Sequence, residues 1–280
     1  MNHETSALDR LAINTDLVRP VLVNFLREEI CKVGYQRAVV GLSGGIDSAV
    51  SLALAAEALG PRNVLAVIMP YRTSSAASEG DARAVAAQFG VAIRKIEISA
   101  MVEPLLAVNP QLSNVRRGNV MARMRMIVLY DQSEEFKALV VGTSNKTELL
   151  LGYGTLYGDM ASALNPVGDL YKTQLRQLAR AIGIPRPVME KPPTADLWVG
   201  QTDEAELGVT YEVADQVLFM LVDERCPERD VIAAGFDPAI VRALNLRIRN
   251  NQFKRSLPII AKISGRSIGT DFLYLRDWGR

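Results

Sequence analysis

The 280-residue sequence has one histidine, His3, and two cysteines, Cys31 and Cys226. A Ser-His-Asp triad, a Cys-His pair and a multi-histidine metal site therefore cannot be built. Two cysteines without a C-x-x-C pair also exclude a disulfide framework and a structural zinc site, which favours a reducing compartment. Each cysteine lies in a helical pattern, and we interpret both as core residues. Catalysis must then use carboxylates, lysine, arginine, hydroxyls or backbone groups.

Long apolar runs and an excess of one charge are also missing. No run approaches the roughly 18 apolar residues that cross a membrane, and the amino terminus MNHETSALDR lacks the apolar segment of a signal peptide. Thirty-two Lys and Arg residues against 31 Asp and Glu residues give a net charge of +1, without the basic excess of a chain that coats nucleic acid. We therefore expect a cytoplasmic protein with no membrane and no nucleic-acid partner.

Apolar residues make up 49% of the chain, and their spacing predicts an α/β fold. Residues 8–30 have helical spacing, which predicts one helix or two helices broken near Pro20. Short apolar runs predict strands at 38–42, 64–69, 93–98 and 138–142, and helices are expected up to Leu59 and at 79–89, 119–130 and 172–182. Apolar strands that alternate with helices indicate a doubly wound, Rossmann-like parallel sheet that is covered on both faces.

We expect one domain over residues 1–280 in three parts. About 1–35 would be helical, about 36–184 would form the α/β core, and about 185–280 would form an α-helical extension. Prolines mark an irregular segment at the start of the extension, and the pattern that follows is helical.

The first predicted strand runs directly into Ser43-Gly44-Gly45-Ile46-Asp47-Ser48, and a helix follows. Ligands bind beyond the carboxyl ends of the strands in open parallel sheets, so this turn is well placed for a phosphate. Gly44 and Gly45 lack a Cβ, so backbone N–H groups can close around an anion at the start of the helix. Asp47 suits a Mg²⁺ ion that neutralises phosphate charge, and the alternative is a glycine turn with Asp47 as a helix cap. No Gly-Lys-Ser/Thr follows, which argues against a Walker loop.

The segment GLSGGIDS at 41–48 resembles the pyrophosphatase loop of the N-type ATP pyrophosphatases, which cleave ATP to AMP and pyrophosphate. Further motifs are similar to ammonia-dependent NAD synthetase: GTSNKTE at 142–148, GYGTLYGD at 152–159, YKTQ at 171–174 and KPPTADLWVGQTDEAELGVTY at 191–211. They run in order from about Val18 to Pro258, which is far more specific than one loop. The resemblance implies an ATP-dependent amide ligase that adenylates the nicotinate carboxylate of deamido-NAD and aminates it with ammonia to give NAD, AMP and pyrophosphate.

The resemblance also implies a role for each matching residue. ATP would be bound by Gly41, Leu42, Ser43, Gly44, Gly45, Ile46, Asp47, Ser48, Thr143, Lys172 and Thr194. Asp47 and Glu148 would bind Mg²⁺, and together with Lys172 they would form the catalytic set; the alternative for Glu148 is the polar face of a short helix. Deamido-NAD would contact Arg123, Asp159 and Lys254. We interpret Arg125 as structural and Arg72 as a solvated loop arginine.

Three positions depart from the family pattern. Leu156, Ala163 and Phe253 stand where the family usually has lysine, aspartate and histidine, all in the deamido-NAD site. An unmatched polar group on a substrate typically costs ~1–3 kcal/mol, so we expect a more apolar pocket with weaker recognition of the dinucleotide. Two alternatives stay open: a paralogous ligase that amidates a different carboxylate, and a nucleotide-binding protein without turnover. Release of pyrophosphate separates the enzymes from the binding protein.

The resemblance further implies partners. The substrates would be ATP, ammonia and deamido-NAD or a related carboxylate, with Mg²⁺ as cofactor. Glutamine use would need its own domain and an activated cysteine, so ammonia would arrive free or from a separate donor. A homodimer is implied, with the dinucleotide site at the subunit boundary; helices at 121–130 and 217–222 are candidate interfaces, although a monomer core explains them equally well.

Overall fold

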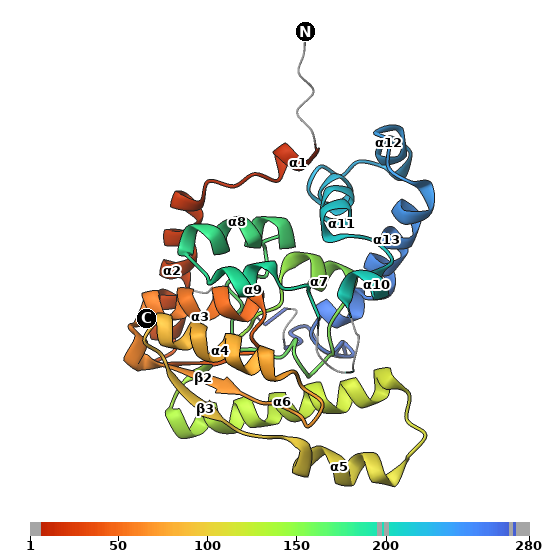
Figure 1. Cartoon of the computed structure of the whole chain (residues 1–280). Helices are drawn as coiled ribbons and strands as arrows, with labels where there is room; N and C mark the ends of the chain where they lie inside the picture. The colour runs from red at the N-terminus through yellow and green to blue at the C-terminus, as the bar shows by residue number, and fades with distance from the viewer. Residues whose placement is uncertain (1–6, 195–197, 199–201, 269–270, 273–280) are drawn as a thin grey trace.

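The computed structural model of the chain describes residues 7–194, 198, 202–268 and 271–272 (Figure 1). Its centre is a four-stranded parallel sheet in the order β3-β2-β1-β4. The strands are β1 (Ala38–Gly41), β2 (Val64–Ile68), β3 (Ala92–Lys95) and β4 (Leu139–Val141). The parallel sheet that the sequence predicts is therefore confirmed.

The third strand is shorter than predicted. It ends at Lys95 instead of Ile98, because its partner β2 stops at Ile68 and the nearby Pro70 has no N–H to donate. Two further bonds remain, from the Ile96 N–H to the Ile68 carbonyl at 2.9 Å and from the Ile98 N–H to the Pro70 carbonyl at 3.0 Å. The chain therefore follows β2 a little further without forming a ladder.

Alternate strand residues face two different helical layers. Ala38 and Val40 pack in one buried cluster, whereas Val39 packs in another on the opposite face of the sheet. One layer contains α2 (Thr15–Lys32), α3 (Ile46–Leu59), α4 (Ala76–Gln88) and α8 (Lys172–Ile182), and the other contains α5 (Ser99–Val108) and α6 (Asn114–Phe136). The central strands β1 and β2 are buried between the two layers, which explains why they are apolar. The edge strand β3 is partly exposed and ends in Arg94 and Lys95.

The remaining helices fall into two groups, the short helices and those of the C-terminal extension. The short ones are α1 (Ala7–Arg10), η1 (Pro61–Asn63), α7 (Lys146–Leu151) and α9 (Arg186–Glu190). The predicted helical extension is confirmed, and it comprises α10 (Asp203–Leu207), α11 (Tyr211–Leu218), the π-helical η2 (Phe219–Asp223), α12 (Glu228–Ala233), α13 (Pro238–Asn250) and η3 (Gln252–Arg255). Among the described helices, none combines the length and the apolar character that a bilayer crossing requires.

Two of the sequence expectations concern the N-terminal region: a helix break near Pro20 and a buried Cys31. Helix α2 continues unbroken through Pro20, whose missing N–H would have bonded the carbonyl of Asp16. Both residues are exposed, so water can satisfy that carbonyl. The interpretation of Cys31 as a core residue is wrong, because its side chain is exposed at the end of α2. His3 lies outside the described residues.

The extension has its own buried cluster. Val217 and Leu218 are fully buried in it, and Cys226 packs against it half-buried. Leu151 of α7 and Tyr171, just before α8, belong to the same cluster. The helix at 217–222 was expected to form either a dimer interface or part of the monomer core, and Val217 and Leu218 belong to the monomer core. The extension therefore packs directly onto the elements that follow β4.

Candidate active site

A cavity of about 500 Å³ opens at the carboxyl ends of β1, β2 and β4. This is where an open parallel sheet binds its ligands. Its walls come from the loop after β1, the end of β2, helix α6, the loop after β4, the segment at 152–161 and the segment at 191–194. Most of the predicted site residues line it: Gly41, Leu42, Ser43, Gly45, Ile46, Asp47, Ser48, Thr143, Glu148, Asp159, Lys172, Thr194 and Lys254.

The glycine turn after β1 is shaped for an anion. Gly44 has a φ of +83°, and a Cβ built there would lie 2.2 Å from the carbonyl oxygen of Ser78 at the start of α4. Ser48 accepts a hydrogen bond from the Ser43 N–H at 3.2 Å and donates one to the Gly45 carbonyl at 3.0 Å. The serine hydroxyls thus hold the shape of the turn.

Helix α3 begins directly after this turn and has no side-chain cap. Gly45 occupies the N-cap position, so the alternative reading of Asp47 as the capping residue is wrong. The N–H groups of the first turn of α3 are therefore not covered by a capping side chain and point toward the start of the helix. The positive end of the helix adds to their attraction for a phosphate.

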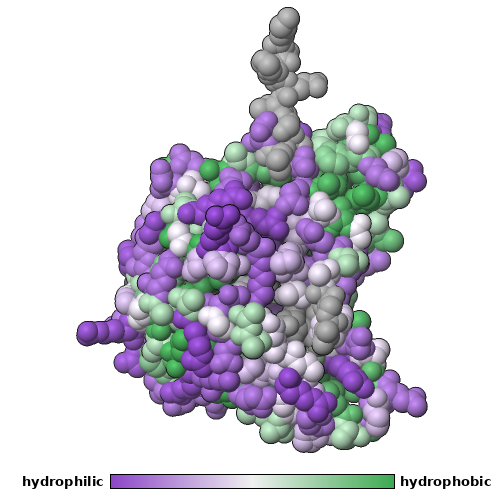
Figure 2. Space-filling model, viewed as in Figure 1, coloured by the Kyte–Doolittle hydropathy of each residue, from purple (hydrophilic) through white to green (hydrophobic). Residues whose placement is uncertain are grey.

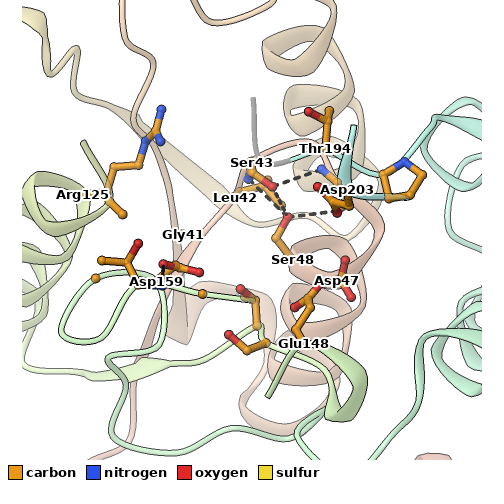
Figure 3. Close-up of a pocket in the computed structure, with 18 of the residues that line it drawn as sticks. Gly41, Leu42, Ser43, Asp47, Ser48, Arg125, Glu148, Asp159, Thr194 and Asp203 are labelled. Atoms are coloured by element: carbon orange, nitrogen blue, oxygen red, sulfur yellow. Dashed lines mark hydrogen bonds between the residues drawn. The ribbon is translucent and has the colours of Figure 1, made fainter. Parts of the chain in front are cut away.

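Three elements bring a lysine and two carboxylates together beside the turn. Figure 3 shows the two carboxylates, Asp47 and Glu148, side by side. Lys172 of α8 has a nearly buried side chain whose Nζ donates to a carboxylate oxygen of Asp47. The same Nζ lies 3.6 Å from an oxygen of Glu148. The ring of Tyr211 lies 5.2 Å from that ammonium group, at cation–π distance. Residues from α3, α7 and α8, far apart in the sequence, thus form one charged cluster.

Asn145 joins the two carboxylates, a role that the sequence alone did not indicate. Its Nδ2 donates to Asp47 at 2.8 Å, and its backbone N–H donates to Glu148 at 3.2 Å. Its Oδ1 accepts from the Glu148 N–H at 3.0 Å, which completes a capping box at the start of α7. The spacing N-x-x-E in NKTE was the available signal for this cap.

The cluster holds more negative charge than one lysine balances. Burial raises the pKa of Glu148 to about 8, and the nearby Asp47 carboxylate adds to this effect. Desolvation lowers the pKa of Lys172, but Asp47 and Glu148 outweigh it and hold that pKa above its usual value. Among the described residues, no group of three or more His, Cys, Asp or Glu side chains is placed to hold a metal. Two oxygen ligands with a deficit of positive charge nevertheless fit Mg²⁺, which typically takes one or two carboxylates together with substrate phosphates.

Of the three residues predicted to contact deamido-NAD, Asp159 and Lys254 line the cavity. Figure 3 places Arg125 and Asp159 at the opposite side from Asp47 and Glu148. Asp159 accepts a hydrogen bond from the Thr155 N–H at 2.8 Å. Lys254 donates to the carbonyls of Gly152 and Gly154, at 2.7 and 2.9 Å. These contacts fix the loop that forms this end of the cavity.

The two neighbouring arginines of α6 have different positions from those expected. Arg123 is exposed and does not line the cavity; its Nε donates to the Leu156 carbonyl at 3.3 Å. Arg125 lines the cavity, and its Nε donates to the Met69 carbonyl at 3.0 Å. The structural interpretation of Arg125 is therefore incomplete, because its side chain also faces the ligand space. Arg72 is exposed and pairs with Glu103 at 3.1 Å, as expected of a solvated loop arginine.

The three departures from the family pattern do not line the cavity. Ala163 and Phe253 are exposed, and Leu156 is half-buried in the loop that Arg123 contacts. The expectation that they make the pocket more apolar is therefore wrong for the cavity of a single chain. Their side chains face other surfaces, so they leave its lining unchanged.

Asp203 is a further cavity residue, which could not be assigned a role from sequence. Its buried carboxylate accepts from the hydroxyls of Tyr153 and Tyr211, at 3.0 and 3.2 Å. Burial raises the pKa of Asp203, while the charge of Lys172 opposes this. Its only signal was its place in the QTDE sequence at the start of α10, because its hydroxyl partners are not adjacent in sequence.

A parallel sheet whose first strand leads through a glycine turn into a helix, beside a lysine and two carboxylates, is typical of a nucleotide-binding α/β protein. A sequence model described as NAD synthase matches residues 18–258. The chain belongs to the NAD synthase family.

Individual relatives agree with this assignment. The NH(3)-dependent NAD(+) synthetase of Trichlorobacter lovleyi is 58% identical over 98% of this chain and 100% of its own. An NH3-dependent NAD synthetase from Campylobacter jejuni, solved with nitrate ion, superposes with a TM-score of 0.77 at 33% identity, over 90% of this chain and 100% of that one. The structure of an NMN synthetase from Francisella tularensis superposes with a TM-score of 0.80 at 30% identity, over 89% of this chain and 99% of that one.

Proposed function

We propose that the protein is an ATP-dependent amide ligase that converts deamido-NAD to NAD. A nicotinate carboxylate oxygen bonds to the α-phosphorus of ATP, and the bond to pyrophosphate breaks. Ammonia then forms the amide bond at the carboxyl carbon, and AMP leaves. The observation that carries the proposal is the charged cluster of Lys172, Asp47 and Glu148 beside the anion-shaped turn. Family membership and the 58% identical ammonia-dependent relative support the same reaction.

The residues of the cavity supply the positioning that this reaction needs. The turn at 41–48 and the N-terminus of α3 would hold the ATP phosphates, and Thr143 and Thr194 would contact the nucleotide from two other walls. The Lys172 ammonium group would lie where two anions must meet, so it reduces their repulsion. Asp47 and Glu148 would bind Mg²⁺, which would neutralise further phosphate charge and stabilise the leaving pyrophosphate.

Asp159 and Lys254 would contact deamido-NAD, and both line the cavity. Figure 3 shows Asp159 on the opposite side from Asp47 and Glu148. Arg123 lies on the exposed surface of α6, a position suited to a ligand bound where two copies of the chain meet. Neither Cys31 nor Cys226 lines the cavity, so no cysteine is placed to hydrolyse glutamine there. Free ammonia, or ammonia from a separate donor, is the nitrogen source in this proposal.

The three parts of the sequence act as one unit in this proposal. Leu11 before α2, Leu151 of α7 and Val217 of the extension pack in the same buried cluster. We propose a single domain over residues 1–280 on this basis.

The test is a product analysis with competing acceptors. With ATP, Mg²⁺ and ammonium, we expect deamido-NAD to give NAD with equal amounts of AMP and pyrophosphate, identified by mass. Nicotinate mononucleotide is the matched competitor, because one structural relative is an NMN synthetase. Amidation of the mononucleotide alone would support the paralogue, and ATP binding without any pyrophosphate would support the binding protein.

We also propose a homodimer formed through α5 and α6. Large apolar side chains are exposed on these helices outside the cavity: Met101, Leu105, Val108, Ile127 and Tyr130. Apolar surface is visible in Figure 2 along the lower edge of the molecule, where Figure 1 places α5. Exposed apolar residues gathered on neighbouring helices are typical of an interface.

Sedimentation velocity at micromolar concentration is expected to give twice the mass of the chain. Ile127→Glu should shift the protein toward the single chain, because a charge would be buried in the interface. Leu246→Glu on α13 is the control, since Leu246 is exposed to a similar extent away from α5 and α6. A wild-type protein that sediments as one chain would refute the dimer.

A further inference from the structure

Asp215 of α11 is a buried carboxylate that the proposed reaction does not use. One of its oxygens accepts from the Thr173 N–H at 2.7 Å, and the other accepts from the Thr147 hydroxyl at 2.5 Å. The Thr147 oxygen in turn accepts from the Lys172 N–H at 3.1 Å. Asp215 and Thr147 are both fully buried. One carboxylate thus ties the first turn of α8 to the first turn of α7.

Asp223 at the end of η2 makes a parallel pair of contacts. It accepts from the Tyr171 hydroxyl, and it accepts from Lys146 Nζ at 2.7 Å. The Lys146 ammonium group also lies 4.8 Å from the centre of the Tyr171 ring. Like Asp215, Asp223 therefore connects the N-terminus of α7 to the N-terminus of α8.

The four residues that these aspartates hold surround the charged cluster in sequence. Tyr171 and Thr173 lie on either side of Lys172, and Lys146 and Thr147 directly precede Glu148. Lys172 and Glu148 themselves make no bond to either aspartate among the hydrogen bonds of the described residues. The aspartates therefore hold the backbone beside each cluster residue and leave both side chains directed at the cavity.

The π-helical turn explains how two aspartates eight residues apart serve the same face. An uninterrupted α-helix turns ~100° per residue, so residues eight apart would point about 80° away from each other. A π-turn bonds each residue to the fifth one along and advances less per residue. The η2 segment therefore brings Asp223 back toward the face of α11 that carries Asp215.

We propose that Asp215 and Asp223 are positioning residues that fix the placement of Lys172 relative to Glu148 for the attack on ATP. The inference rests on the proposed function, in which those two side chains act at the phosphates. Both oxygens of Asp215 are used and the site is buried, so the carboxylate cannot change partners without leaving a buried N–H or hydroxyl unpaired. Small displacements of positioned groups cost up to about 100-fold in rate, which sets the scale of the effect.

The first test is Asp215→Asn, which keeps the size of the side chain but can accept from only one of the two donors. We expect kcat for pyrophosphate release to fall on the order of 10- to 100-fold, with the KM for ATP changed by less than about 3-fold. Glu224→Gln is the matched control, because Glu224 follows Asp223 directly but pairs with Arg10 of α1. We expect its kcat to stay within about 2-fold of wild type. An Asp215→Asn enzyme with wild-type kcat would overturn the proposal.

A second set of variants tests the same proposal if Asp215→Asn folds poorly. Thr147→Val removes the hydroxyl that links Asp215 to Lys172, and Thr147→Ser retains it. Loss of kcat in the valine variant with recovery in the serine variant supports positioning, whereas equal losses in both would contradict it. Tyr171→Phe removes one bond of Asp223 and should lower kcat by a smaller factor.

Hydrogen exchange provides a readout that does not depend on turnover. In Asp215→Asn, the amides of Lys172 and Thr173 should exchange faster, while the amides of α3 keep wild-type protection. Faster exchange in α3 as well would indicate general destabilisation and overturn the proposal. A wild-type protein that makes no NAD from deamido-NAD contradicts the proposed function instead, and the exchange result then still decides whether the aspartates hold the two helices.

Discussion

Asp47→Asn is expected to lower pyrophosphate release by about 10³-fold, because it removes the charge with which this residue would bind Mg²⁺ and pair with Lys172. The asparagine retains an oxygen that can accept from Asn145 Nδ2, so the local packing is kept. Asp47→Ala should lose as much activity, since in both variants the missing group is the charge. The measurement is steady-state release of pyrophosphate at saturating ATP and varied Mg²⁺.

The same substitution should leave the protein folded. Asp47 raises the pKa of Glu148, after burial itself, so its removal relieves repulsion between two carboxylates. Lys172 keeps Glu148 as a partner at 3.6 Å, so its charge is not left alone. We expect little change in the midpoint of thermal unfolding.

The control is Asp271→Asn, which neutralises another aspartate–lysine pair, with Lys262 at 2.7 Å, outside the cavity. Its activity should match wild type. An active Asp47→Asn enzyme with unchanged Mg²⁺ dependence would contradict both the metal assignment and the role of the cluster.

The fold was predictable because its strands and helices follow from local patterns of apolar residues in the sequence. Apolar strands such as β1 and β2 differ from the helices around them in period, and the turn at Gly44 interrupts both patterns. The helix predicted at 172–182 coincides with α8. The end of β3 was not predictable, because it depends on where its neighbour β2 loses an N–H.

The site was predictable only as a set of residue types. Asp47 lies 98 residues before Asn145 and 125 residues before Lys172. The contacts among these residues arise from the packing of α3, α7 and α8. Sequence motifs place each of them near a strand or helix end but do not state which pairs touch. Asn145 and Asp215 were missed for this reason, since each acts by joining two elements.

The two arginines of α6 illustrate a second limit. Residues two apart in a helix point about 160° away from each other, so Arg123 and Arg125 cannot both face the cavity. The ARMRM sequence offers the same side chain at both positions. The face that meets the cavity is set by how α6 packs under the sheet, where Met121 and Val128 are buried.

Gly44→Ala should reduce ATP affinity by about 100-fold, although it adds only one methyl group. The new Cβ would lie 2.2 Å from the carbonyl oxygen of Ser78, which is backbone and cannot rotate away. Ser78 is also held through its hydroxyl by Lys191 at 2.8 Å, which resists a shift of α4. The turn must therefore open, and the N–H groups that cradle the phosphates would move with it.

Gly60→Ala is the control, because it introduces backbone strain without this clash. Gly60 has a φ of +84°, against +83° for Gly44, but no atom lies within 4 Å of a Cβ built there. Both variants cost on the order of 1–3 kcal/mol for placing alanine at a positive φ that favours glycine, and only Gly44→Ala adds the collision with α4. Titration calorimetry with Mg²⁺ and ATP should then show wild-type affinity for Gly60→Ala and weak binding for Gly44→Ala. Equal affinities for the two variants would mean that the turn does not form the phosphate site.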